Sequence, residues 1–488
     1  MANKKNEKIH VAIEESTEST SRSFMSFFAK REKIFPARVR GKFRRLKWLA
    51  MAVLLSIYYI TPWLRWHRGE GLPDQAILLD IQHRTFYFFG LEIWPQEVIL
   101  LAAILLFAAI LLFFVTALFG RIWCGYACPQ TVWTDLFIMV ERFFEGNRHK
   151  QLKDEASGWS LDRLWRKVAK HAVWIVIGAA TGGAWVFYFN DAPTLVENLF
   201  KGEASFVAVF WMAFLTLSTY IMAGFAREQV CTYMCPYARF QGAMFDTDTL
   251  VVAYDESRGE PRGKHTGGDC IDCGRCVQVC PVGIDIRDGQ QYQCINCALC
   301  VDACNDVMSH IDKPLGLIRY NSMSGMVKED HGLAEAVTHL KYIRPRTIAY
   351  FFVMSAIIGY IIYSLTIGRM WVEINVEHER NPLYVQLADG SIRNIYNIRI
   401  INKRPQAIEF TLRLDDKIAK LSVPTLKQKN LSELKVNLKP REVANYRVLV
   451  DLPKKNVPVG RQEMMIHLES AVYHDTYDTV FIGPEKEK

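Results

Sequence analysis

Twelve cysteines, all before residue 305, have the most informative spacing in this 488-residue chain. Eight of them form two consecutive runs, and each run has the spacing C-x2-C-x2-C-x3-C. The first run is Cys270, Cys273, Cys276 and Cys280, and the second is Cys294, Cys297, Cys300 and Cys304. Thiolates at this spacing suit a pair of [4Fe–4S] clusters, because three close cysteines hold one cubane and the fourth reaches the other.

This spacing assigns the ligands of each cluster. Cluster one takes Cys270, Cys273, Cys276 and Cys304, and cluster two takes Cys294, Cys297, Cys300 and Cys280. A structural zinc site or a disulfide framework is the alternative, but zinc sites more often use two separated C-x2-C pairs. Pro281 follows the first run as in bacterial ferredoxins, whereas Asn305 follows the second. We predict two [4Fe–4S] clusters in a reducing compartment.

The other four cysteines form two C-x3-C-P motifs, each after an apolar stretch and an arginine. They are Cys124 and Cys128 after Arg121, and Cys231 and Cys235 after Arg227. On a continuing helix each pair would share one face, although the following prolines predict a break. Buried small hydrophobes are the alternative. The arginines predict a lowered thiol pKa, and four soft thiolates would select Cu(I), zinc or iron–sulfur iron. We predict that these four are catalytic, with copper as the candidate ion.

Five apolar runs are long enough to cross a bilayer, and the loops between them differ in charge. The runs are 48–66, 98–119, 172–189, 204–226 and 347–367. Lys and Arg are dense before the first run, between the second and third, and after the fourth, whereas 72–94 and 190–203 hold one each. We therefore expect the cluster region in the cytoplasm and the C-terminal segment outside. The net charge of +8 then reflects membrane topology, with no nucleic-acid partner and no signal peptide.

The last 120 residues change character. Alternating apolar and polar residues recur between Pro, Gly and Asn turns, which predicts an all-β, immunoglobulin-like sandwich. The expected fold is an α-helical membrane protein with five transmembrane helices, a double [4Fe–4S] ferredoxin domain and this sandwich. The predicted domains are a basic cytoplasmic segment 1–46, a four-helix membrane region 47–226 built as a duplicated hairpin, a ferredoxin domain 227–345, a fifth transmembrane helix 346–368 and a periplasmic domain 369–488.

Several stretches together resemble the CcoG family, also called FixG or RdxA. They are KREKIFPARVRGKFRRLKW, the PWL at 62–64, both C-x3-C-P motifs, YDESRGEPRG at 254–263, the double cysteine run and the C-terminal β region. The resemblance implies a multi-pass protein of the bacterial inner membrane that supports assembly of cbb-type cytochrome oxidase as a cupric reductase. The implied partners are the lipid bilayer, a cytoplasmic electron donor, a copper chaperone or transporter and the oxidase subunits. A homo-oligomer stays open.

Two other functions remain open. The membrane polyferredoxins of nitrate and nitrous-oxide respiration share the C-x3-C-P motifs and the double cluster, so an electron relay from quinol is the second hypothesis. His171 could serve a quinone or a haem, although a single histidine is more often a packing residue. The third hypothesis is a non-enzymatic assembly scaffold or redox sensor. Copper-dependent turnover would identify the first function, and quinol-dependent cluster reduction the second.

Overall fold

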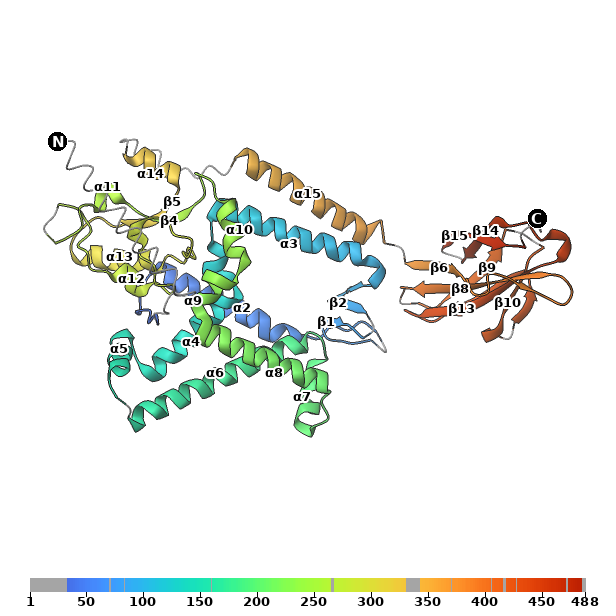
Figure 1. Cartoon of the computed structure of the whole chain (residues 1–488), viewed down its shortest axis with the longest axis horizontal. Coiled ribbons are helices and arrows are strands. Elements are labelled where there is room, and N and C mark those ends of the chain that lie inside the picture. Colours follow the sequence, from blue (N-terminus) through green and yellow to red (C-terminus); the bar gives the residue numbers. More distant parts are fainter. Residues whose placement is uncertain are drawn as a thin grey trace, which may run out of the picture. The chain divides into compact units, whose positions relative to one another are not determined.

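A computed structural model describes residues 33–69, 72–82, 84–158, 160–264, 267–330, 343–369, 371–404, 406–415, 418–426, 428–470 and 473–484. The part of the predicted basic segment before residue 33 lies outside this range. The chain divides into two compact units, Met1–Ile361 and Ile362–Lys488, and each is described by itself (Figure 1).

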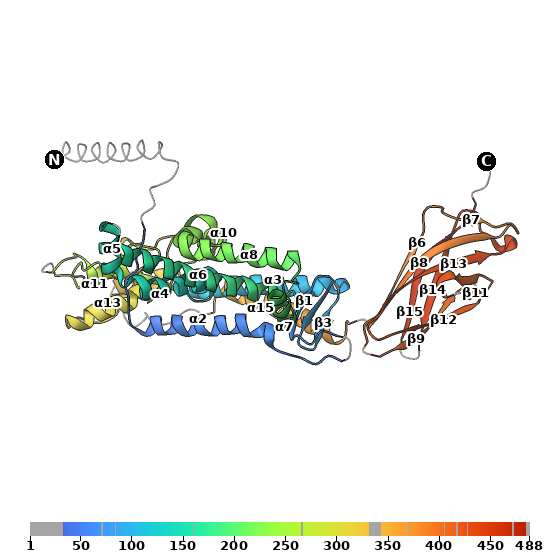
Figure 2. The same ribbon diagram turned by 90° about the horizontal axis from the view of Figure 1, so that it is seen from below.

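The first unit contains the helices that the apolar runs form. Its elements are α2 (Lys42–Ile60), β1 (Ile77–Asp80), β2 (Thr85–Phe88), β3 (Leu91–Ile93), α3 (Val98–Phe119), α4 (Pro129–Glu145), α5 (Arg148–Ala156), α6 (Leu161–Phe187), α7 (Ala192–Lys201), α8 (Phe206–Ile221), α9 (Arg227–Gln229), α10 (Pro236–Met244) and α15 (Pro345–Thr366). Figure 2 shows α2, α6 and α8 running along one another, and α6 packs closely on α8. The antiparallel sheet β1–β2–β3 fills a segment that we expected to be a plain loop.

Four of the described helices are long and apolar enough to cross a membrane: Lys42–Trp63, Val98–Phe119, Phe206–Met234 and Pro345–Thr366. The first begins at Lys42, six residues before the predicted run. The predicted run 172–189 is helical as far as Phe187, the end of α6, but this helix does not reach the same apolarity. Its composition follows from packing, since a Cβ on Gly182 would lie 2.7 Å from the carbonyl oxygen of Met212 in α8. Small residues at such a contact allow two helix backbones to approach closely, and they lower the mean hydropathy of the helix.

The beginning of α2 is fixed to the cysteine-rich region. The carboxylate of Asp302 accepts hydrogen bonds from the backbone N–H of Arg44 at 2.7 Å and of Phe43 at 3.3 Å. A carboxylate is favourable there because the first turn of a helix has unpaired N–H groups and a partial positive charge. The Arg44 guanidinium also pairs with Asp135 of α4 at 2.8 Å, in a buried position. This end of the basic segment is therefore bound within the fold.

The cysteine-rich region repeats one backbone conformation in both runs. Strands β4 (Val251–Tyr254) and β5 (Ile318–Asn321) pair antiparallel, and the main helices are α12 (Arg275–Val279) and α13 (Leu299–His310), with α11 (Glu256–Gly259) and α14 (Met323–Asp330) at the edges. The left-handed residues before α12 are Asp272 and Gly274, and their equivalents before α13 are Asn296 and Ala298. The two runs thus wrap in the same way, as the repeated spacing predicts.

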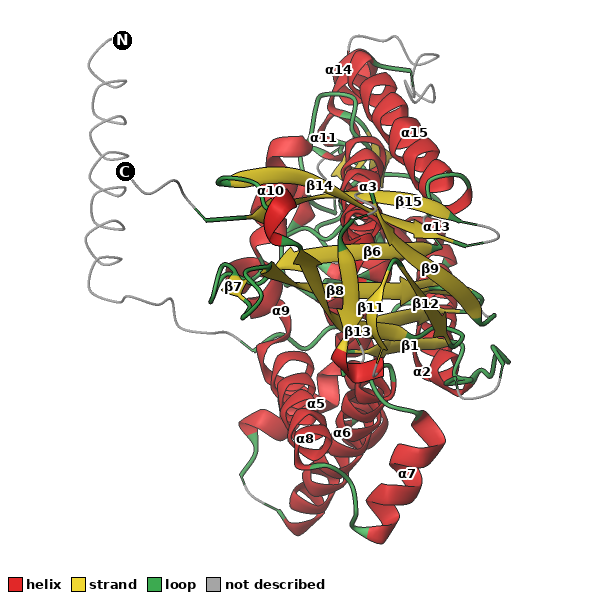
Figure 3. Ribbon diagram, turned by 90° about the vertical axis from the view of Figure 1, so that its right-hand side faces the viewer, coloured by secondary structure: helices red, strands yellow, loops and turns green. Residues whose placement is uncertain are grey.

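The second unit is a two-sheet β structure, which confirms the predicted all-β domain. Its strands are β6 (Val372–His378), β7 (Val385–Gln386), β8 (Ile392–Asn402), β9 (Ile408–Leu414), β10 (Lys420–Val423), β11 (Gln428–Leu431), β12 (Glu433–Leu438), β13 (Val443–Leu452), β14 (Arg461–Glu469) and β15 (His474–Ile482). One sheet has the order β11-β10-β13-β8-β6, with β7 on β8, and the other has β12-β9-β14-β15 (yellow in Figure 3). Alternate residues such as Phe410, Leu412 and Leu414 are buried, and they form the core with their counterparts from the other strands.

Candidate metal and electron-transfer site

Both C-x3-C-P motifs form the same local structure. A π-helical turn covers Trp123–Ala127 in the first and Val230–Met234 in the second. Each turn ends at the second cysteine in extended backbone, and a new helix, α4 or α10, starts at the proline. The predicted helix break is confirmed, and it occurs without strain because proline at the first helical position lacks only an N–H that would be unpaired anyway. Single π turns of this kind are frequent at functional sites.

The helices after the two motifs cross over between the halves of the repeat. Helix α4 packs on α6, the first long helix of the second half, and α10 packs on α3, which precedes the first motif. Gln130 after the first motif donates to the carbonyl oxygens of Met222, at 2.9 Å, and Arg227, at 3.2 Å. In the opposite direction, the Cys124 thiol donates to Oε1 of Gln241 in α10 at 3.4 Å. This exchange brings the thiols of the two motifs together.

The four thiols lie close enough to influence one another's ionisation. Burial raises the pKa of Cys124 to about 12, and the neighbouring Cys128, Cys231 and Cys235 raise it further, while Arg121 lowers it. The prediction of a lowered thiol pKa is therefore wrong for Cys124, because burial outweighs Arg121. Arg227 does not supply the expected charge either, since its guanidinium pairs with Glu141 at 2.6 Å. No three His, Cys, Asp or Glu side chains of the described residues converge on one single-ion position.

The first motif touches the loop that carries the second cysteine run. A Cβ on Gly125 would lie 2.7 Å from the carbonyl oxygen of Ile295 and 3.1 Å from Cα of Cys297, so only glycine fits. The Tyr126 hydroxyl donates to the carbonyl oxygen of Cys297 at 3.2 Å. Cys124 packs in the same apolar cluster as Cys297 and Cys300. The membrane thiols and the expected cluster-two ligands are thus direct neighbours.

Arg121 reinforces this contact from a buried position. Its guanidinium donates to the carbonyl oxygens of Tyr292, in the loop before the second run, and Ala238, in α10. The side chain therefore joins three segments: the first motif, the cluster loop and the helix after the second motif. Its charge sits beside the thiols, where it favours any negative charge that develops on sulfur.

The structure brings the cysteines of the two runs close to one another. Burial raises the pKa of Cys304 to about 12, with further contributions from Cys276, Cys273 and Cys270. Cys304 thus lies among the first three cysteines of the other run.

Cys280 of the first run lies next to the second run. Its pKa is raised by burial and then by Cys297. For Cys300 the neighbours that raise the pKa after burial are Cys297, Cys294, Cys280 and Cys276. The division of the eight cysteines between two clusters stays a prediction.

These cysteines suit iron–sulfur clusters. The thiols of Cys276, Cys280, Cys294, Cys297 and Cys300 line one cavity whose other walls are mainly Val, Ile, Leu and Ala side chains. Such a buried set favours protonated thiols when free, so the positive charge of iron has to drive their deprotonation. An apolar shell of this kind also limits solvent access to a bound cluster.

Three known proteins align with most of the chain. FixG of Rhizobium meliloti is 43% identical over 97% of this chain and 97% of its own length. Protein RdxB of Cereibacter sphaeroides is 52% identical over 79% of this chain and 83% of its own, and RdxA of that organism is 48% identical over 80% and 83%. The chain belongs to the FixG/RdxA family.

Family profiles match three parts of this FixG/RdxA-family chain. The profile "4Fe-4S dicluster domain" matches residues 226–267 and 260–323, and "IG-like fold at C-terminal of FixG" matches 362–484. A third, "4Fe-4S binding domain", matches 101–150, which includes Cys124 and Cys128. The protein is therefore a membrane iron–sulfur electron-transfer protein, and its first C-x3-C-P motif lies in a segment that itself resembles iron–sulfur domains.

Sequence reasoning about this FixG/RdxA-family chain missed the residues that join the parts. They are Gly125, Tyr126, Gln130, Gln241 and Asp302. A glutamine one residue after the first CP and another five residues after the second were a weak signal, because polar side chains in apolar helices usually face the protein interior. Gly125 gave no signal, since glycine is common in membrane helices.

Proposed function

We propose that this protein is an oxidoreductase that reduces Cu(II) to Cu(I) at Cys124, Cys128, Cys231 and Cys235. The electrons come from two [4Fe–4S] clusters, and the Cu(I) serves assembly of a cbb-type cytochrome oxidase. One observation carries the proposal: the turn that holds Cys124 lies directly against the loop of Cys297.

The division of labour follows from ligand chemistry. The clusters, when bound, supply single electrons, and each of their irons already has its cysteine, so copper has to bind elsewhere. The four membrane thiols are the remaining cysteines of the chain. Soft thiolates prefer Cu(I), and each Cu(II) needs one electron to become Cu(I). Burial keeps the free Cys124 thiol protonated, so copper binding should release protons.

A small cavity beside Cys231 connects this thiol to the cluster loop. Its volume is about 30 Å³, and Cys231, Val282 and Ile295 are among the residues that line it. The second motif therefore also lies next to the cysteine-rich region, as the first motif does.

The charge of the loops supports one orientation for this reaction. With the arginine- and lysine-rich loops in the cytoplasm, the clusters face a cytoplasmic electron donor, and the β domain lies in the periplasm. The copper donor would be a chaperone or transporter, and the oxidase subunits would receive the product.

A chelator assay tests the proposal. Protein purified without oxygen and reduced with dithionite, with excess dithionite removed, is mixed with Cu(II) and a Cu(I)-specific chelator. We expect up to about two Cu(I) per chain, one for each cluster electron. Cluster reduction without any Cu(I) would reject the cupric reductase function and leave a relay or a scaffold.

A further inference from the structure

A second cavity, of about 390 Å³, lies beside the thiol site along one face of α6. Residues at helical spacing on α6 form one wall, and the π-helical turn between α8 and α9, with the start of α9, forms another. The lining side chains are Lys33, Ile34, Glu141, Lys167, Lys170, His171, Trp174, Phe225, Arg227 and Glu228, with Gly224 at the backbone. Cavities of this size accept a small organic ring.

The cavity places a histidine among aromatic rings. The imidazole of His171 stacks on Phe225, with ring centroids 5.9 Å apart and planes 10° apart. Its Nδ1 is 3.0 Å from the Tyr220 hydroxyl, which fixes the ring and leaves Nε2 for a ligand. In its neutral form the imidazole has one ring nitrogen that can accept a proton.

The deep charges of the cavity are already paired. Arg227 binds Glu141 at 2.6 Å, and Lys170 binds Glu145 at 2.8 Å, all in buried positions. The Lys170 ammonium and the Arg227 guanidinium also lie over the ring of Trp174. A neutral aromatic ligand therefore suits the interior better than an anion, which would have to compete for paired cations.

The cavity borders both the apolar span and the redox site. Phe225 belongs to the candidate membrane span Phe206–Met234 and is 45% exposed, so a lipid-soluble molecule can reach it from the side. On the same wall, Arg227 and Glu228 also line the small cavity that contains Cys231 and Ile295 of the cluster-two loop. The two cavities share this one wall.

From this arrangement we infer that the His171 cavity binds the head group of a membrane quinol and receives its electrons. His171 accepts a proton from one quinol hydroxyl. The quinol loses two electrons and two protons and becomes quinone, and each of the two clusters takes one electron. This donor feeds the copper reaction proposed above: one quinol and two Cu(II) give one quinone, two Cu(I) and two protons.

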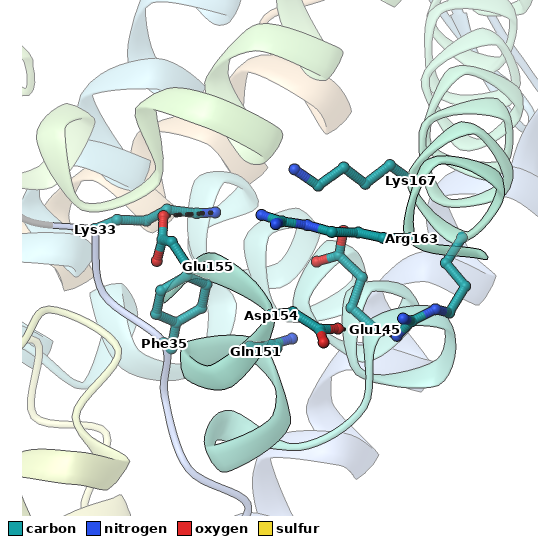
Figure 4. Close-up of a pocket in the computed structure, with 9 residues that line it drawn as sticks. Lys33, Phe35, Glu145, Gln151, Asp154, Glu155, Arg163 and Lys167 are labelled. Atoms are coloured by element: carbon teal, nitrogen blue, oxygen red, sulfur yellow. Dashed lines mark hydrogen bonds and ion pairs between the residues drawn. The ribbon is translucent and has the colours of Figure 1, made fainter. Parts of the chain in front are cut away.

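A smaller, charged cavity adjoins the His171 cavity. It shares Lys33 and Lys167 with the His171 cavity and adds Glu145, Asp154 and Glu155 (Figure 4). Lys33 pairs with Glu155 at 3.8 Å, and Arg166 pairs with Asp154 at 3.0 Å. Its volume is about 40 Å³, too small for an organic ligand, so the head group is assigned to the larger His171 cavity.

Stopped-flow absorbance on the whole oxidised protein tests the inference. A short-chain naphthoquinol is added without oxygen, and bleaching of the cluster absorbance is followed. We expect the rate to fall about 100-fold in His171→Phe, the scale of a lost general base. The matched control is His149→Phe, an exposed histidine on α5 outside the cavity, which should react like the wild type. Dithionite should reduce all three proteins fully.

Each remaining outcome has a definite meaning. If the quinol reduces His171→Phe as fast as wild type, or does not reduce the wild type, the inference is wrong. The cavity is a lipid site instead if two results occur together. Binding of anionic phospholipid is then lost when Lys167 is replaced, and quinol reduction does not depend on His171. Dithionite reduces the clusters without using the cavity. If the dithionite-reduced wild type produces no Cu(I), the copper function is refuted, whereas the test of the quinol site is unaffected.

Discussion

The thiol of Cys124 donates a hydrogen bond to Oε1 of Gln241 at 3.4 Å, although the two residues belong to different halves of the internal repeat. Gln241 is fully buried, and Tyr237 also lies against its side chain. A buried polar side chain needs hydrogen-bond partners, and the Cys124 thiol is one of them. We attribute the glutamine at this position to orientation of the copper-binding thiol.

Replacing Gln241 should therefore affect copper more than stability. In Gln241→Leu the thiol loses its acceptor while a side chain of similar volume fills the buried position, so we expect weaker Cu(II) reduction and unchanged iron content. Chelator assays on reduced protein measure the first, and iron analysis measures the second. Gln290→Leu, on an exposed residue of the cysteine-rich region, is the control. Equal copper activity in both variants would contradict the role.

Gly125 should be intolerant of any side chain. A Cβ there would meet the backbone of Ile295 and Cys297, which cannot move like a flexible side chain, so Gly125→Ala should separate the Cys124 turn from the cluster loop. We expect a loss of about 1–3 kcal/mol in stability and slower electron transfer to copper. Thermal unfolding and single-turnover Cu(I) formation measure the two effects. Gly158→Ala, which has open space around it, should change neither.

Local sequence patterns predicted the cysteine motifs and the secondary structure, but they did not predict the contacts between distant segments. The cysteine spacing, the helix break at Pro129 and Pro236 and the β alternation are local patterns, and the structure contains each of them. The fit of Gly125 against Ile295 depends on how distant segments pack, which no local pattern records. The pKa of Cys124 was misjudged for the same reason, because a sequence shows the neighbouring Arg121 but not the depth of burial.

Hydropathy alone does not identify helix α6 as a membrane span. Its glycines pack against α8 and lower the mean hydropathy of the helix. The bond between Asp302 and the first turn of α2 places the start of α2 on the same side as the cysteine-rich region. That requires an even number of crossings between them, and α2, α3 and α8 provide three. We therefore expect α6 to be the fourth.

Reporter fusions can test the crossing by α6. A fusion at Gly158, before α6, should report the cytoplasm, and one at Glu203, after α7, should report the periplasm. Fusions at residues 300 and 430 should also lie on opposite sides, because α15 alone separates them. The same location for Gly158 and Glu203 would mean that α6 does not span the membrane.

The buried pair Arg44–Asp135 should be a major source of stability. Asp135→Asn leaves a buried guanidinium without its anion, so we expect a loss of about 3–5 kcal/mol in the free energy of unfolding. The exposed pair Lys201–Glu197 provides the control, since Glu197→Gln should cost less than about 1 kcal/mol. Melting curves in detergent compare the two, and equal losses would contradict the assignment.

The same pair gives a pH dependence. Burial alone would raise the pKa of Asp135, but Lys47 and Arg44 outweigh it and hold the pKa below its ordinary value. The stabilisation is therefore complete above the unfolded-state pKa of about 3.9 and is lost as the pH falls through the lower folded-state pKa. Asp135→Asn should abolish this part of the acid sensitivity.

The most direct test of the copper site is Cu(I) production by the double variant Cys231→Ser, Cys235→Ser, compared with wild type after anaerobic reduction by dithionite. We predict that the variant keeps about eight iron and eight sulfide per chain, as two cubanes require, and produces no Cu(I). Cys124→Ser with Cys128→Ser should behave in the same way if the four thiols form one site. Full Cu(I) production after replacement of all four thiols would contradict the account and return these cysteines to a packing role.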